Sequence, residues 1–121
     1  MGNILLVEDN EDNSDMLMRR LERRGYEVIL ATDGEQALAM ARAAHPGLIL
    51  MDMRIPLVDG WTVTMRLKSL PETQAIPIIG LSAHALTQDR DKALAAGCDE
   101  YETKPIDFPK LLAKIHNLMK E

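Results

Sequence analysis

The stretch that most constrains the fold is a run of four apolar residues, Leu48–Met51, that ends in a single acid, Asp52. The run is too short for a helix, and consecutive apolar residues are typical of a strand buried on both faces of a parallel sheet. A loop that contains Pro56 follows it. Asp52 is therefore predicted to stand where a buried strand reaches the surface, held by a rigid scaffold and open to solvent at one end.

Four other segments predict strands. Two are short apolar runs, Ile4–Val7 and Val28–Ala31, and a third, Ile76–Leu81, contains a proline. The last, Glu100–Thr103, is half polar, and in a sheet of this kind a half-polar strand belongs at an edge.

Helix patterns fill the intervals between these strands. They run from about Ser14 to Arg24, from Asp33 to about Ala44, from Asp59-Gly60 to Pro71, and from about Thr87 to Ala96, and Asp107 caps a last helix. Asn and Asp residues ahead of a helix accept hydrogen bonds from its free N–H groups. Five strands that alternate with five helices predict a doubly wound α/β fold, a parallel sheet with helices on both faces.

The length, composition, net charge and cysteine count of the chain exclude several classes of protein. At 121 residues, with 46% apolar and 27% charged residues, the chain 1–121 is expected to form one globular domain. The net charge of −5 argues against a surface that binds nucleic acid. The single cysteine, Cys98, excludes a disulfide framework and a cysteine-based metal site. Without a membrane-length apolar run or a signal-peptide pattern, we expect a cytoplasmic protein with no membrane partner.

Polar side chains follow four of the predicted strands where each strand ends. They are Glu8 and Asp9, Asp52, Ser82 and Lys104. In an open parallel sheet, chemistry lies outside the carboxyl ends of the strands, so these groups are expected to converge. Crowded carboxylates raise one another's pKa unless a cation neutralises them, and oxygen ligands suit Mg²⁺.

This set of groups has the parts needed for reversible phosphorylation of Asp52. A carboxylate can act as a nucleophile and form an aspartyl phosphate. Phosphoryl transfer needs positioning and charge stabilisation more than covalent help. The metal ion would hold one phosphoryl oxygen, Lys104 a second, and the Ser82 hydroxyl with nearby backbone N–H groups a third.

The chain resembles the receiver domain of two-component response regulators, the CheY-like family, from Ile4 to about Met119. The motifs that carry the resemblance are Val7-Glu8-Asp9-Asn10, Met51-Asp52-Met53-Arg54-Ile55-Pro56 with Asp59-Gly60, Leu81-Ser82-Ala83, and Gly97-Cys98-Asp99 leading to Lys104-Pro105. The resemblance implies a (βα)5, flavodoxin-like sheet in the order 2-1-3-4-5. It also implies a signalling switch that catalyses only its own phosphorylation and dephosphorylation.

The resemblance assigns metal and acceptor roles. Asp52 would receive the phosphoryl group from a phosphohistidine on a sensor histidine kinase or a histidine phosphotransfer protein. Asp9 would bind Mg²⁺, with Mn²⁺ as a possible substitute, and Glu8 would act through water, with Asp52 and the Arg54 carbonyl as further ligands. Glu8 stands where many members of the family have Asp.

The resemblance also assigns the groups that sense the phosphoryl group. Ser82 and Lys104 would bind its oxygens, helped by the backbone N–H groups of Met53 and Ala83. Tyr101 matches an aromatic switch residue that would turn inward as Ser82 moves, which would alter the partner-binding face of the fourth helix, fifth strand and fifth helix. The Lys104–Pro105 peptide bond is expected to be cis, which only X-Pro bonds adopt cheaply.

Two side chains are candidates for setting the lifetime of the phosphorylated state. Arg54 lies two residues after Asp52, and His84 two residues after Ser82. We hypothesise that they restrict or orient the hydrolytic water; the alternative is that both are solvated loop side chains without kinetic effect. Trp61, after Asp59-Gly60, is interpreted as a packing residue of the helix surface.

Two other functions compete with a signalling switch. A phosphatase of the haloacid-dehalogenase type needs a second acid two residues after its nucleophile, where this chain has Arg54, and usually a cap domain, for which there is no room. A flavodoxin-like FMN protein needs a phosphate-binding loop where this chain has acids. The downstream target stays open, as does the choice between a free-standing regulator and a receiver from a hybrid kinase or larger regulator.

Overall fold

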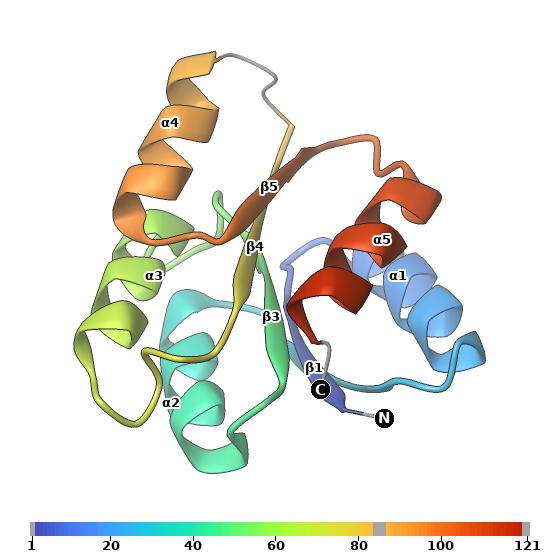
Figure 1. Ribbon diagram of the computed structural model, residues 1–121, viewed down its shortest axis with the longest axis horizontal. Coiled ribbons are helices and arrows are strands. Elements are labelled where there is room, and N and C mark those ends of the chain that lie inside the picture. The colour runs from blue at the N-terminus through green and yellow to red at the C-terminus, as the bar shows by residue number, and fades with distance from the viewer. Residues whose placement is uncertain (1, 84–86, 120–121) are drawn as a thin grey trace.

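The protein is a parallel five-stranded sheet between two layers of helices (Figure 1). The computed structural model describes residues 2–83 and 87–119. The strands are β1 (Asn3–Val7), β2 (Glu27–Ala31), β3 (Leu48–Asp52), β4 (Ile78–Ser82) and β5 (Glu100–Thr103). They lie in the order β2-β1-β3-β4-β5, and all four neighbouring pairs are parallel, which confirms the predicted fold and strand order.

The helices are α1 (Glu11–Arg23), α2 (Gly34–Ala44), α3 (Gly60–Ser69), α4 (Thr87–Ala96) and α5 (Phe108–Leu118). Figure 1 shows α2, α3 and α4 on one face of the sheet and α1 and α5 on the other. Each face has its own apolar core, so the side chains of the central strands are buried alternately in the two cores. Every residue of β3 is buried, as its unbroken apolar run predicts.

Side-chain caps decide where the helices begin. Asn10 Oδ1 accepts from the Asn13 N–H at 3.0 Å, so α1 begins at Glu11 and not at Ser14, as the sequence indicated. Glu11 and Asp12 then lie in the first turn, where the helix dipole stabilises negative charge. Of the acids after β1, only Glu8 and Asp9 remain outside the helix.

Strand β4 begins two residues later than the sequence indicated. Ile76 is buried, but its N–H donates to the Thr73 carbonyl at 3.1 Å and closes a turn. Pro77 has no N–H, and its carbonyl accepts from the Ile49 N–H at 2.9 Å before the ladder starts at Ile78. The prediction that Glu100–Thr103 forms an edge strand is confirmed, because β5 ends the strand order.

Within the described ranges, no helix is both long and apolar enough to cross a membrane.

Candidate functional site

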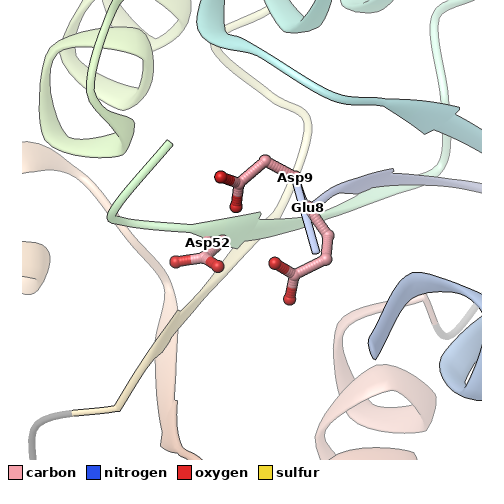
Figure 2. Close-up of side chains that lie close together, drawn as sticks. All are labelled: Glu8, Asp9 and Asp52. Atoms are coloured by element: carbon pink, nitrogen blue, oxygen red, sulfur yellow. The ribbon is translucent and has the colours of Figure 1, made fainter. Parts of the chain in front are cut away.

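Three carboxyl groups meet at the carboxyl ends of β1 and β3. These strands are neighbours in register, with Val7 opposite Met51, so the residues that follow them, Glu8 and Asp9, arrive beside Asp52. One oxygen from each of the three carboxyl groups lies within 4.8 Å of the others. Figure 2 shows the three side chains gathered at this edge of the sheet. Glu8 and Asp52 are buried, and Asp9 is exposed.

Lys104 reaches this cluster from the edge of the sheet, because it directly follows the edge strand β5. Its backbone N–H donates to the Ser82 carbonyl at 2.7 Å, which fixes the residue beside the end of β4. Its Nζ donates to Glu8 Oε1 at 2.7 Å and to Asp52 Oδ2 at 2.8 Å. Adjacent strands are about 4.8 Å apart, so only a long side chain can span from β5 across β4 to these carboxylates.

The charges at this edge do not balance. Burial raises the pKa of Glu8 more than the hydrogen bond from Lys104 lowers it, and the nearby Asp52 raises it further. Burial lowers the pKa of Lys104, but the bonds to Asp52 and Glu8 outweigh burial and raise it overall, so the ammonium form is favoured. One ammonium therefore faces two buried carboxylates, with Asp9 as a third acid nearby. This surplus of carboxylate oxygens suits a hard divalent cation.

Asp52 is less open than its sequence position indicated, because only 5% of the residue is exposed. Its Oδ2 is covered by Lys104, and its Oδ1 accepts from the Arg54 backbone N–H at 2.9 Å. Sequence reasoning missed this N–H, although an aspartate that bonds the backbone two residues on is a known turn pattern. The Met53 N–H donates to the Leu81 carbonyl at 3.0 Å, so its role toward a phosphoryl group remains a prediction.

The remaining predicted residues lie along β4 and β5. Ser82 is the last residue of β4, is buried, and lies one position beyond Leu81, the register partner of Asp52. Ala83 follows it and is exposed, whereas His84 lies outside the described residues. The Lys104–Pro105 peptide bond is cis, as the resemblance implies.

Tyr101 is already inside the protein. It is 6% exposed and belongs to the core beneath α2, α3 and α4. Its ring lies over Gly80, where an added Cβ would come 3.3 Å from Cδ1. The inward position that the resemblance implies for the switched state is therefore occupied in this structure.

The Arg54 side chain leaves the carboxylate cluster and lies over an aromatic ring. Its Cζ is 5.2 Å from the centre of the Trp61 ring, and Lys92 Nζ from α4 is 3.9 Å from the same ring. Trp61 packs against the core, in agreement with the interpretation of this residue as helix packing.

A groove of about 520 Å³ opens beside the site on the α1 side. It lies between α1 and the segment after β5, and its lining residues are Glu8, Asn13, Met16, Leu17, Arg20, Lys104, Pro105 and Ile106. Met16 and Arg20 lie four residues apart on α1 and so share one helix face. This spacing was visible in the sequence, but nothing in the sequence showed what lies opposite it.

The protein is a doubly wound α/β domain with acids, a hydroxyl and an ammonium at the carboxyl ends of its strands, the edge where open parallel sheets bind their ligands. Residues 4–116 match the family model of the response regulator receiver domain. The chain belongs to this family.

Relatives and solved structures agree with the family model. The polar-differentiation response regulator DivK of Brucella ovis is 39% identical over 116 residues, which cover 96% of this chain and 94% of DivK. The transcriptional regulator RpaA of Synechocystis is 38% identical over 99% of this chain, which spans 50% of RpaA. The receiver domain of the Pseudomonas aeruginosa sensor histidine kinase PA1611 superimposes with a TM-score of 0.92 at 36% identity, covering 99% of this chain and 98% of that one; it was solved with a magnesium ion in its active-site cleft.

Proposed function

We propose that this receiver domain is a phosphorylation-dependent switch in which Asp52 accepts a phosphoryl group from a phosphohistidine of a sensor histidine kinase or a histidine phosphotransfer protein. The observation that carries the proposal is the contact of Asp52 with Lys104 beside two further acids, Glu8 and Asp9. A structural ion pair needs one acid for each base, and this cluster has more acids than that.

The reaction transfers the phosphoryl group from nitrogen to oxygen. An Asp52 carboxylate oxygen attacks the phosphorus, the bond to the imidazole nitrogen of the donor breaks, and that nitrogen keeps the electron pair. Hydrolysis reverses the modification, since water attacks the phosphorus and Asp52 regains its carboxylate. The domain processes no metabolite, and the chemistry that it assists is confined to its own side chain.

The donor set fits Mg²⁺, because three carboxyl groups lie within 4.8 Å of one another at the edge of the sheet. Asp9 and Asp52, with the Arg54 backbone carbonyl, would hold the ion, and Glu8 would act through water. When bound, Mg²⁺ supplies positive charge next to the phosphoryl oxygens, and Mn²⁺ would serve in its place. The magnesium ion in the related PA1611 domain supports this assignment.

Lys104 contacts Asp52 and Glu8, which supports the proposal that it pairs with a phosphoryl oxygen on Asp52. The Ser82 hydroxyl and the N–H groups of Ala83 and Met53 complete the set of donors. For Met53 this requires its N–H to be shared with, or released from, the Leu81 carbonyl.

The signal leaves through the face formed by α4, β5 and α5. Tyr101 is buried beneath α4, and Lys114 of α5 donates to the Tyr101 carbonyl at 2.8 Å. Lys114 also pairs with Glu102 of β5. A shift of β5 at Lys104 would therefore reach α5 through Lys114, and a downstream protein would sense the changed face.

The groove beside α1 is where we place the phosphodonor protein. It opens at Glu8 and Lys104, so a partner seated in it would bring its histidine to Asp52. The lifetime of the product would depend on two loop residues, Arg54 and His84, which follow Asp52 and Ser82 by two positions each in the sequence.

A small phosphodonor tests the proposal without knowledge of the partner. The protein is incubated with acetyl phosphate and Mg²⁺, and its intact mass is measured. We expect the mass of one added phosphoryl group, absent when Mg²⁺ is chelated before acetyl phosphate is added and absent from Asp52→Asn. Lys68→Met is a matched control, because Lys68 also pairs with an acid, Asp99, but at the opposite end of the sheet. An equal mass gain in Asp52→Asn would refute the proposal.

A further inference from the structure

The ring of Trp61 is shared by two cations from different parts of the fold. Arg54 comes from the loop after β3, and Lys92 from α4. The indole N–H of Trp61 is buried and meets no acceptor in the described part of the chain. The orientation of the ring is therefore held by packing against the core and by the two cations.

Arg54 contacts Asp52 through its backbone and Trp61 through its side chain. Its backbone N–H donates to Asp52 Oδ1 at 2.9 Å, whereas its guanidinium lies over Trp61. The residue is exposed, so no packed side chain prevents the guanidinium from swinging back toward Asp52. In this structure Lys104 already pairs with the Asp52 carboxylate, which weakens the attraction between that carboxylate and the guanidinium.

Phosphorylation would change this balance. A phosphoryl group adds negative charge and three acceptor oxygens. A guanidinium binds such oxygens with charge-assisted, often bidentate hydrogen bonds. A cation–π contact at an exposed site is worth a factor of only about two to five in an equilibrium constant. The Arg54 guanidinium should therefore leave the Trp61 ring and bind the phosphoryl oxygens.

We propose that Trp61 is a positioning residue for Arg54: it holds the guanidinium over α3 while Asp52 is unmodified and releases it to the phosphoryl oxygens when Asp52 is phosphorylated. This inference rests on the proposed function. Arg54 bound to the phosphoryl group shields it from water, so the ring competes with a contact that prolongs the phosphorylated state.

A double-mutant comparison of phosphoryl lifetimes tests the competition. Arg54→Ala should shorten the lifetime of the aspartyl phosphate, because the shield is lost. Trp61→Leu removes the competing ring and should lengthen the lifetime by less than about five-fold, because most of the Arg54 guanidinium has already left the ring in the phosphorylated state. In the Arg54→Ala background, Trp61→Leu should have no effect, because no guanidinium remains to be released. An equal effect of Trp61→Leu in both backgrounds would overturn the inference.

A second readout uses the unaltered ring, in case Trp61→Leu does not fold. Trp61 is the only tryptophan, so its fluorescence reports this ring alone. On phosphorylation with acetyl phosphate and Mg²⁺, the emission of the wild type should change, whereas Arg54→Ala should be phosphorylated with no such change. Lys92→Gln is the matched control: it removes the other cation from the ring and should keep the phosphorylation-dependent change.

Intact mass, measured on the same samples, separates the two ideas. A wild type that gains no phosphoryl mass overturns the proposed function, and this inference with it. A wild type that gains the mass with unchanged Trp61 emission overturns only the inference. Arg54→Ala with the full wild-type emission change does the same.

Discussion

Two lysines, one at each end of the sheet, pair with carboxylates but differ in the number of acids around them. Lys104, at the carboxyl ends, contacts the carboxylates of Glu8 and Asp52. Lys68, at the end of α3, contacts the single carboxylate of Asp99 at 3.0 Å and the carbonyls of Gln74 and Ile76. Asp99 in turn accepts from the Ile78 N–H at 2.8 Å.

The difference lies in the charge balance. At the Lys68 end, one ammonium contacts one carboxylate and backbone carbonyls, so the charges of this ion pair cancel. The cluster connects the turn before β4 to the start of β5. At the Lys104 end, two buried carboxylates share one ammonium, and Asp9 adds a third acid. An excess of buried charge is costly to keep, and on the proposed function it is retained at this end of the sheet because the cluster serves chemistry rather than stability.

The largest difference between the two ends should appear in the rate of phosphorylation. Lys104→Met removes the cation nearest to Asp52 and should slow labelling by acetyl phosphate about 10²-fold, the usual cost of losing one charge-stabilising donor. Lys68→Met should leave the rate within the error of the wild type. The rates are measured by intact mass over time. Similar losses in the two variants would abolish the distinction between the ends.

Magnesium should stabilise the protein by binding at the carboxyl end of the sheet and not at the Lys68 end. At about ten times its dissociation constant, a ligand that binds only the folded state raises the free energy of unfolding by about 1.4 kcal/mol. We expect a gain of this size for the wild type and little for Asp9→Asn, measured by urea unfolding with and without Mg²⁺. Asp99→Asn alters the acid at the other end and should keep the full gain. An equal gain in Asp9→Asn would remove Asp9 from the metal site.

The balanced end should matter for stability alone. Asp99→Ala leaves the Ile78 N–H and Lys68 without their carboxylate and should lower the free energy of unfolding by about 1 kcal/mol, a modest value because Asp99 is partly exposed. Its phosphorylation rate should stay at the wild-type value. A variant as stable as the wild type, or one that is folded but not phosphorylated, would contradict this assignment.

The smallest effect concerns pH. Because the pKa of Glu8 is raised above 4.5, the folded state binds its proton more tightly than the unfolded state does. This contribution to stability is present at low pH and is lost as the pH rises from 4.5 through the raised value. Urea unfolding of the metal-free protein across this range should show the decline in the wild type and a flatter curve for Glu8→Gln. Parallel curves for the two proteins would mean that burial does not raise the pKa of Glu8.

Most of the fold could be predicted from the sequence, because its signals are local. The run that ends at Asp52, and the acids, hydroxyl and lysine after the other strands, each report the end of one strand, and parallel pairing brings those ends together. The predicted starts of α1 and β4 were wrong, because the local signals there were ambiguous. Several Asn and Asp residues could cap α1, and the apolar Ile76 precedes a proline that delays β4.

Contacts between distant segments could not be read in the same way. The stacking of Arg54 and Lys92 on Trp61 joins a loop and two helices, and no spacing along the chain encodes it. The same holds for the groove between α1 and Ile106. The inward position of Tyr101 depends on its side-chain conformation above Gly80, which the strand pattern leaves open.

The central claim is that the covalent change occurs on Asp52 itself, and locating the phosphoryl group tests it most directly. Borohydride reduces an acyl phosphate to an alcohol and so converts a phosphorylated aspartate into homoserine. After treatment with acetyl phosphate and Mg²⁺, followed by borohydride, peptide mass spectrometry should find homoserine at position 52 alone. Modification at Asp9 or Glu8 with Asp52 intact would contradict the account, as would a phosphorylated protein that gives no homoserine.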